Sequence, residues 1–295
     1  MTDISDSSAI DRDGNRSIVA TVTGLATSDG AGVRLTRYIG TPTLDMVDPF
    51  LLLDVFESDN PDDYIAGFPS HPHRGFETVT YLLAGRVRHE DSKGHVGILR
   101  PGGVQWMTAG RGIVHSEMPE QENGLLKGFQ LWINLPAAHK MSAPSYQEYE
   151  PEELPVESSE DGVEVRVIAG ETSSGTSGLV KNHLTDPVYM DISLVKGGEF
   201  VQPIADTHSA FLYVDRGTVS VVGAETGEQQ IVDSGQLAVL GEGRQVELRS
   251  EKADARLLLV AAMPLNEPVS RGGPFVMNTE QEVIQAFKDY QEGKF

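Results

Sequence analysis

The chain has 295 residues, a formal net charge of −21 and no cysteine. The length suits about two domains, and the absence of cysteine excludes disulfides, zinc fingers, thiolate metal sites and a cysteine nucleophile. Any bound metal must therefore be held by nitrogen and oxygen ligands, and the negative charge disfavours direct binding to nucleic acid.

The first sixteen residues are polar and small and contain no apolar run. We expect residues 1–16 to form a flexible tail, and nothing in them resembles a signal peptide. No later stretch reaches the ~18 apolar residues of a membrane span. These features predict a soluble, cytoplasmic protein that does not bind a membrane.

Short apolar segments alternate with turn signals over residues 17–135. Each segment has the length and alternation of a strand, and no long helical period lies between them. This rhythm predicts a first all-β domain, a sandwich or barrel. The segments are SIVATVTG, VRLTRYIG, FLLLDVFE, TVTYLLAGRVRHE, HVGILRPGG, GIVHSEM and FQLWINL.

Residues 136–161 interrupt the pattern with four prolines and a cluster of Glu and Asp. We interpret this segment, which lacks sustained strand alternation, as an acidic, proline-rich linker that crosses the surface in extended form. Its acidic part, residues 148–161, could contact a partner protein, although solvated linker is the commoner role of such a sequence.

Residues 162–295 repeat the rhythm of the first half. TVTYLLAGRVRHE and AFLYVDRGTVSVV share the pattern of apolar strand, glycine and apolar strand, which favours an internal duplication. The chain ends in a predicted helix that Thr279 can cap, with one face formed by Val283, Ile284 and Phe287. We expect this helix to pack against a sheet.

Two pairs of polar residues have the spacing of metal ligands on strands. His71 and His73 stand two residues apart, as do His115 and Glu117. Residues i and i+2 of a strand point to the same face, so neighbouring strands would bring three imidazoles and one carboxylate together. Such a buried cluster is costly unless a metal uses the lone pairs. Four further histidines stand alone in the sequence, and we expect structural roles for them: His89, His95, His139 and His183.

These motifs resemble those of the pirin family. HPHRGFETVTYLLAG and GILRPGGVQWMTAGRGIVHSEMPE are similar to its two cupin motifs, and DPFLLLDVFE and RGGPFVMNTEQEVIQAFKDY are similar to further pirin segments. The resemblance covers most of residues 33–135 and the last 25 residues. It implies an all-β bicupin, with two jelly-roll β-barrel domains in tandem and a C-terminal helix. It also implies one metal ion in the N-terminal barrel, held by His71, His73, His115 and Glu117.

The resemblance makes Fe(II) our first choice of metal, because pirins usually hold iron. Three imidazoles and a carboxylate also suit Mn(II), Ni(II), Cu(II), Co(II) or Zn(II). Four protein ligands leave about two positions of an octahedral ion open to water, substrate or O2. Such openness is typical of catalytic rather than structural sites.

Residues around the two motifs are candidates for supporting roles. We place Glu77 on the strand of the histidine pair, where it either orients a ligand histidine or makes an ordinary strand hydrogen bond. Arg74 and Arg111 flank the pairs and would orient the ligand carboxylate or an anion, unless they form structural salt bridges. An apolar and aromatic set suits the walls of a metal cavity, and we expect Trp106 and Met107 to line it. That set is Phe68, Trp106, Met107, Phe129 and Trp132.

The second half keeps no comparable ligand set. His208 stands where the first half has its histidine pair, and Asp206 is the one carboxylate at strand spacing from it. A single neutral imidazole does not make a metal site. We therefore predict a structural second domain over residues 162–295 and one tightly held metal per chain.

The resemblance implies two kinds of function. One is a dioxygenase of the quercetin 2,3-dioxygenase type, in which a flavonol binds through its 3-hydroxyl and reacts with O2, and Glu117 is both ligand and catalytic base. The other is an iron-dependent, redox-sensing regulator that binds a transcription factor or a metabolic enzyme. An open site among aromatic residues favours the enzyme.

Overall fold

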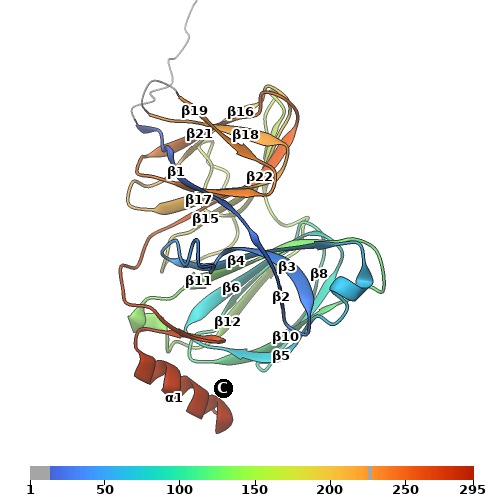
Figure 1. Cartoon of the computed structure of the whole chain (residues 1–295), viewed down its shortest axis with the longest axis vertical. Helices are drawn as coiled ribbons and strands as arrows, with labels where there is room; N and C mark the ends of the chain where they lie inside the picture. The colour runs from blue at the N-terminus through green and yellow to red at the C-terminus, as the bar shows by residue number, and fades with distance from the viewer. Residues whose placement is uncertain (1–13, 225–227) are drawn as a thin grey trace, which may run out of the picture.

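The computed structural model describes residues 14–224 and 228–295. Figure 1 shows two sheet-rich halves, one above the other, with a helix at the lower end. This architecture confirms the expected all-β fold of two cupin-type domains with a C-terminal helix. Within the described residues, no helix is long and apolar enough to cross a membrane.

The N-terminal half contains a seven-stranded and a four-stranded antiparallel sheet. The strand order is β12-β9-β6-β11-β4-β3-β2 in the large sheet and β5-β10-β7-β8 in the small one. Two short 3-10 helices accompany them, η2 (Pro61–Asp63) and η3 (Ala137–His139). The strands are β2 (Leu25–Asp29), β3 (Val33–Ile39), β4 (Phe50–Ser58), β5 (Phe68–His73), β6 (Phe76–Ala84), β7 (Val87–Asp91), β8 (Val96–Leu99), β9 (Val104–Thr108), β10 (Ile113–Pro119), β11 (Leu126–Asn134) and β12 (Ser145–Tyr149).

The C-terminal half repeats this arrangement. Its large sheet has the order β1-β20-β17-β22-β15-β14-β13, and its small sheet has the order β16-β21-β18-β19. The strands are β1 (Ile18–Thr23), β13 (Val156–Ser158), β14 (Val163–Ala169), β15 (Val188–Leu194), β16 (Glu199–Pro203), β17 (Ser209–Arg216), β18 (Thr218–Val222), β19 (Gln229–Asp233), β20 (Gln236–Leu240), β21 (Gln245–Arg249) and β22 (Ala255–Ala262).

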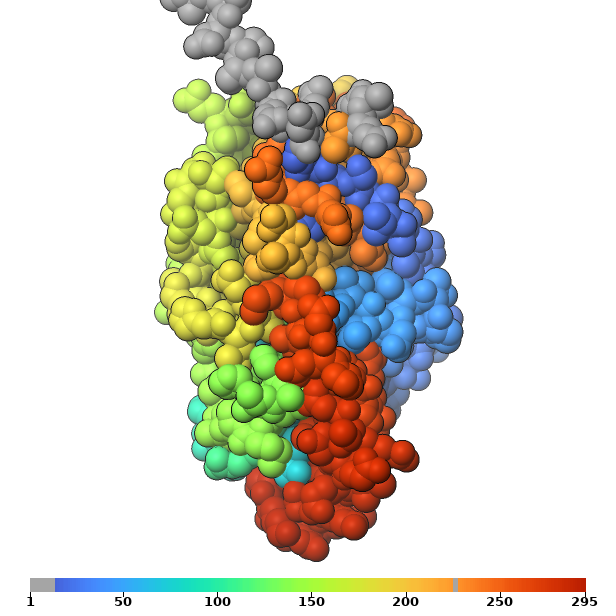
Figure 2. Space-filling view, turned by 90° about the vertical axis from the view of Figure 1, so that its left-hand side faces the viewer, coloured from blue at the N-terminus to red at the C-terminus, as the bar shows by residue number. Residues whose placement is uncertain are grey.

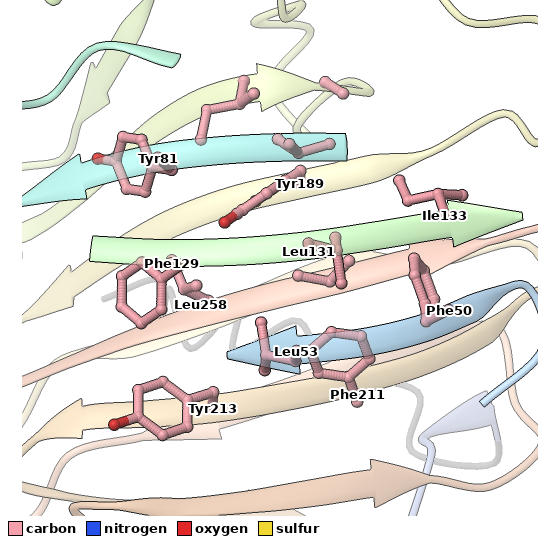
Figure 3. Packing of buried hydrophobic residues seen from close by; sticks show 14 of the residues in the cluster. Phe50, Leu53, Tyr81, Phe129, Leu131, Ile133, Tyr189, Phe211, Tyr213 and Leu258 are labelled. Carbon is pink, nitrogen blue, oxygen red and sulfur yellow. The ribbon is translucent and has the colours of Figure 1, made fainter. Parts of the chain in front are cut away.

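The two large sheets share one hydrophobic core. Figure 3 shows side chains of β4, β6 and β11 meeting those of β15, β17 and β22. Phe50 and Phe211 contact edge to face, with ring centroids 5.1 Å apart. One face of each large sheet packs on the other half and the opposite face on its own barrel, so β4, β17 and β22 are apolar along most of their length.

The N-terminal end of the described chain belongs to the second half. β1 pairs with β20, although the sequence places it in the first domain, and in Figure 1 it lies above β2. Asn15 and Arg16 are buried, and Asn15 Nδ2 donates to the Val222 carbonyl at 2.9 Å. The expectation of a loose tail is therefore wrong for residues 14–16, because buried polar anchors leave no apolar signal. Residues 1–13 lie outside the described residues.

The predicted linker, residues 136–161, contains two strands. β12 pairs with β9 in the first half, and β13 pairs with β14 in the second. Both are edge strands, and an edge strand tolerates acidic side chains and flanking prolines because it is paired on one side only. The expectation that residues 136–161 contain no strand is therefore wrong. The acidic and proline-rich composition of this segment is that of edge strands.

The C-terminal segment returns to the first half. The hairpin of β23 (Ser270–Gly272) and β24 (Phe275–Met277) leads into α1 (Glu280–Gln291), and Thr279 forms the predicted cap as part of a capping box. Figure 2 shows this segment, in red, over the lower part of the molecule. Of the predicted apolar face Val283 is buried, whereas Ile284 and Phe287 are 47% and 40% exposed.

Candidate metal centre

Two paired strands of the small sheet carry the predicted ligand pairs. β5 carries His71 and His73, β10 carries His115 and Glu117, and the register sets His115 opposite His71. The three imidazole rings lie with centroids between 4.4 and 4.9 Å apart. One nitrogen of each ring lies within 4.8 Å of the others. The structure thus brings three of the four predicted ligands together.

The Nε2 atoms of His71 and His73 face each other with their unshared electrons. His71 Nδ1 lies 2.8 Å from the Pro69 carbonyl oxygen, and His73 Nδ1 lies 3.5 Å from that of Pro274. These carbonyls can only accept, so the contacts favour a proton on each Nδ1. The two Nε2 atoms are 3.0 Å apart, and their unshared electron pairs repel unless a cation lies between the rings and the third imidazole.

His115 supports the same conclusion. Both of its ring nitrogens are buried and have no hydrogen-bond partner, a rare state for buried polar atoms. Burial, and then the neighbouring histidines, lower the pKa of His115 and of His73 well below 6.5. Both rings are therefore neutral, the form that binds metals. The residues fit a divalent metal that takes nitrogen ligands.

Glu117 lies beside the three histidines and is held by polar neighbours. Its Oε1 accepts a hydrogen bond from the Thr80 hydroxyl at 2.6 Å, and its Oε2 accepts one from Gln130 Nε2 at 2.9 Å. The carboxylate is buried but stands outside the group formed by the three imidazoles. Its role as a fourth ligand stays a prediction.

A cavity of about 700 Å³ opens from the metal site, with His71, His73 and Glu117 in its wall. Trp132 lies against His73, with centroids 5.2 Å apart. Further apolar lining residues are Leu35, Leu52, Phe56 and Phe68, and polar ones are Arg37, Asp54, Gln130 and Arg271. The candidate metal centre therefore adjoins a cavity that has aromatic walls and a polar side.

The polar side of the cavity contains two residues, Arg37 and Asp54, that lie outside the predicted site. Arg37 and Asp54 stand opposite each other on β3 and β4 and form two hydrogen bonds of 2.7 Å. A single aspartate inside the apolar run FLLLDVFE is the signal that could have revealed this pair, because a buried carboxylate needs a partner.

Trp106 and Met107 do not line this cavity, contrary to expectation. Trp106 belongs to the core between the two halves and donates from Nε1 to Glu77 at 3.1 Å. Met107 packs with Ile113 and Tyr146. Of the wider aromatic set, Phe68 and Trp132 line the cavity and Phe129 is core. Proximity in sequence to the ligand motif did not decide which face each side chain takes.

Glu77 is on a different strand from the histidine pair. Gly75 has a φ of +89°, and a Cβ there would lie 2.0 Å from the Val276 carbonyl oxygen, so only glycine fits. The turn it makes sends His73 to the small sheet and Glu77 to the large one. Glu77 accepts hydrogen bonds from Trp106, Thr108 and Asn182, and burial raises its pKa to about 7. It links the two halves rather than orienting a ligand histidine.

Of the two arginines, Arg74 takes the structural role. The Arg74 Nε donates to the Arg111 carbonyl, and its Nη1 forms an ion pair of 2.8 Å with Asp289 on α1. The guanidinium also lies 4.4 Å from the Phe295 ring centre. The Arg111 side chain is exposed. Arg74 therefore fastens the C-terminal helix to the turn after His73, and its partners do not include Glu117.

Lys140 is a buried residue outside the predicted site. Its Nζ donates to the carbonyl oxygens of Gly75 at 2.7 Å and Val276 at 3.0 Å, and to Asn134 Oδ1. Burial lowers its pKa to about 8. Lys140 thus ties the turn after His73 to the hairpin that carries Pro274, and no local sequence pattern announces it.

The remaining histidines stand outside the metal group. His89 is buried, with Nε2 3.6 Å from Asp91 Oδ2, and its ring stacks on Tyr146. His95 Nδ1 lies 2.7 Å from the same carboxylate. Two more are exposed, His139 and His183. None of these four histidines belongs to the group of three imidazoles, and their structural roles stay a prediction.

In the second half, His208 is buried and its Nε2 lies 3.7 Å from Asp186 Oδ2. Asp206, the carboxylate expected near it, is exposed. Among the described residues, the one group able to hold a metal is formed by His71, His73 and His115.

Comparison with known proteins places these features in a family. Residues 32–133 match the family Pirin, and residues 189–295 match the Pirin C-terminal cupin domain. A pirin-like protein of Caulobacter vibrioides is 51% identical over 280 residues, covering 95% of this chain and 99% of the relative. Human pirin is 43% identical over 282 residues, covering 95% and 94%. The crystal structure of quercetin 2,3-dioxygenase from Acinetobacter baumannii is similar with a TM-score of 0.85 and 34% identity, covering 95% of this chain and 98% of that one.

Proposed function

The chain belongs to the pirin family, and from this premise we propose that it is a metal-dependent dioxygenase of the quercetin 2,3-dioxygenase type. One observation carries the proposal: three imidazoles converge beside a large cavity with aromatic walls, and two of them, His71 and His73, line it. Such a site needs a small aromatic substrate to fill it. The likeness to a quercetin 2,3-dioxygenase structure supports the same class of reaction.

We assign His71, His73, His115 and Glu117 as the residues that would hold the metal, with Fe(II) as the metal. The bound ion would act as a Lewis acid for the substrate hydroxyl and supply the redox chemistry with O2. Glu117 would accept the proton of the substrate hydroxyl. Thr80 and Gln130 each hold one of its oxygens, so the carboxylate is oriented before the substrate arrives.

The rest of the cavity would bind and orient the substrate. Trp132, Phe56 and Phe68 offer flat apolar surfaces to aromatic rings. Arg37 and Asp54 offer a donor and an acceptor on the polar side, as the hydroxyl groups of a flavonol require. The Pro274 carbonyl, from the C-terminal hairpin, would hold His73 in the tautomer that presents Nε2.

The test is turnover of quercetin by the iron-loaded protein under air, followed by loss of flavonol absorbance. We expect multiple turnovers with wild type and none above background with His115→Ala. Equal rates for the two proteins would exclude a reaction at this site, and no turnover with any divalent metal would reject the flavonol as substrate.

A redox-sensing regulator is a second candidate, and the contacts of α1 favour it. Arg74, next to a ligand histidine, binds Asp289 on this helix, and Ile284 and Phe287 remain partly exposed on its surface. A change at the metal would thus reach a surface that a partner protein can contact. Metal-state-dependent binding of a transcription factor or metabolic enzyme, with no flavonol turnover, would select this function.

A further inference from the structure

A small hollow lies beside Glu117, next to the main cavity. It has a volume of about 20 Å³, enough for about one small molecule. Phe56, Phe68, Glu117 and Gln130 line both spaces, so the hollow adjoins the substrate cavity at the candidate ligand. The rest of its wall is mainly apolar: Val33, Val87, Pro119 and Leu126, with Tyr64 and Thr80.

The surface of the hollow is almost entirely apolar, and each polar group around it has a hydrogen-bond partner. Both carboxylate oxygens of Glu117 accept hydrogen bonds from Thr80 and Gln130, and the Tyr64 hydroxyl donates to the Gly124 carbonyl at 2.8 Å. A buried water requires two to four polar partners, whereas apolar cavities of proteins stay dry and take up apolar molecules. The hollow therefore favours a small apolar ligand over water.

We propose that this hollow is a binding site that holds dioxygen beside the metal centre before it reacts. The inference rests on the proposed dioxygenase function for the identity of the gas. Dioxygen is small, apolar and a poor hydrogen-bond acceptor, so it gains from leaving water for an apolar space. The position fits as well, because the hollow meets the main cavity at Glu117, where O2 and a bound aromatic substrate would come together.

The walls are suited to a permanent site. Val33, Phe56, Val87 and Leu126 belong to one cluster of buried apolar residues. They come from strands β3, β4, β7 and β11, which belong to both sheets of the barrel. Close-packed side chains on paired strands hold such a space open without rearrangement.

The first experiment detects the gas without catalysis. In the zinc-loaded protein, which has no redox activity, dissolved O2 is expected to enhance the NMR relaxation of the Val33 and Leu126 methyl groups. The enhancement is expected to exceed that of the methyl groups of Val163, which is also buried but lies in the other half. Crystals under xenon pressure are expected to hold xenon in the hollow. Equal relaxation of all three residues, or an empty hollow under xenon, would overturn the inference.

The second experiment fills the space. Val87→Ile adds one methylene to the hollow, and Val163→Ile makes the same change at a residue of equal exposure, 6% in both cases, in the other half. We expect Val87→Ile to remove the O2 effect on Val33 and to raise the KM for O2 by about 10-fold, with the KM for the flavonol unchanged. Val163→Ile is expected to leave both KM values unchanged.

The outcomes separate the two proposals. An O2-dependent relaxation that Val87→Ile abolishes, in a protein without flavonol turnover, would reject the flavonol as substrate and keep the gas site. Turnover with a KM for O2 that Val87→Ile does not alter would overturn the assignment of the hollow while keeping the function.

Discussion

The two barrels have small sheets of the same strand order that carry different side chains. In the first, β5 and β10 set His71 opposite His115. In the second, β16 and β21 occupy the same positions in the sheet order and set Phe200 opposite Leu248. The interior of the second barrel is mainly a large apolar cluster, whereas that of the first is hollowed by the cavity beside the histidines.

The difference shows how little separates a reaction site from a core. The strand pairing that aligns ligands in one barrel aligns hydrophobic residues in the other. The second barrel has a large apolar interior, and it supplies rigidity through the shared core of Figure 3. The first barrel accepts a cavity and buried polar groups because the second supports one face of its large sheet.

The largest effect is expected from removing one imidazole of the first barrel. His115→Ala should lower metal affinity about 10²–10³-fold, because a four-ligand metal site gains about 10–16 kcal/mol in all. The barrel should stay folded, since the ring makes no hydrogen bond to lose. Metal titration and circular dichroism test this, with exposed His139→Ala as control. Wild-type affinity in His115→Ala would refute the ligand assignment.

A smaller effect, on catalysis, is expected from Glu117→Gln. Glutamine keeps the shape and one oxygen donor but removes the charge and the proton acceptor. Metal binding should be weaker but retained, and flavonol turnover should fall ~10²-fold or more, as when a general base is lost. Rates are to be compared at saturating metal. Unchanged turnover would exclude Glu117 as the base.

The contact between the barrels provides a pH-dependent prediction. The folded-state pKa of Glu77 is raised from 4.5 to about 7 by burial, so the folded protein binds more protons there than the unfolded chain in this range. The free energy of unfolding should fall as the pH rises from 4.5 through 7, by ~3 kcal/mol in total.

In Glu77→Gln this contribution disappears. The difference in free energy of unfolding between wild type and variant, from urea titrations of the metal-free proteins, should change across the same pH range. Histidines that titrate in both proteins cancel in this difference. Parallel pH profiles would show that Glu77 keeps an ordinary pKa.

The smallest effect is expected in the second barrel. His208→Ala should leave one equivalent of metal per chain after exhaustive dialysis, because Asp186 alone is a weak partner for that imidazole. Elemental analysis measures this directly. Two equivalents in wild type, with one lost in the variant, would mean that the second barrel also holds a metal.

The sequence predicts what depends on local period and spacing. The all-β character, the duplication, the capped helix and the convergence of three histidines all follow from alternation, turn residues and the i, i+2 rule. Glu77 shows the limit of such rules. Spacing alone predicts one strand from His73 to Glu77, whereas Gly75, with its positive φ, ends one strand and starts another.

Long-range features escaped prediction because each depends on a partner far away in the chain. The role of Lys140 depends on its hydrogen bonds to Gly75 and Val276, which are distant in the sequence. β12 and β13 look like linker because an edge strand lacks the apolar alternation of a central one. β1 has no property that favours the second sheet over the first until β20 is in place.

The exchange of chain ends between the halves also orders events during synthesis. Asn15 is separated from Val222 by 207 residues, and His73 from the Pro274 carbonyl by 201. At ~5–20 residues per second, a ribosome needs about 10–40 s to make that intervening chain. During this interval Asn15 lacks its partner in the second barrel, and His73 lacks the carbonyl that sets its tautomer. Metal capture in its final geometry therefore becomes one of the last steps in the maturation of this protein, after the C-terminal hairpin has left the ribosome and docked.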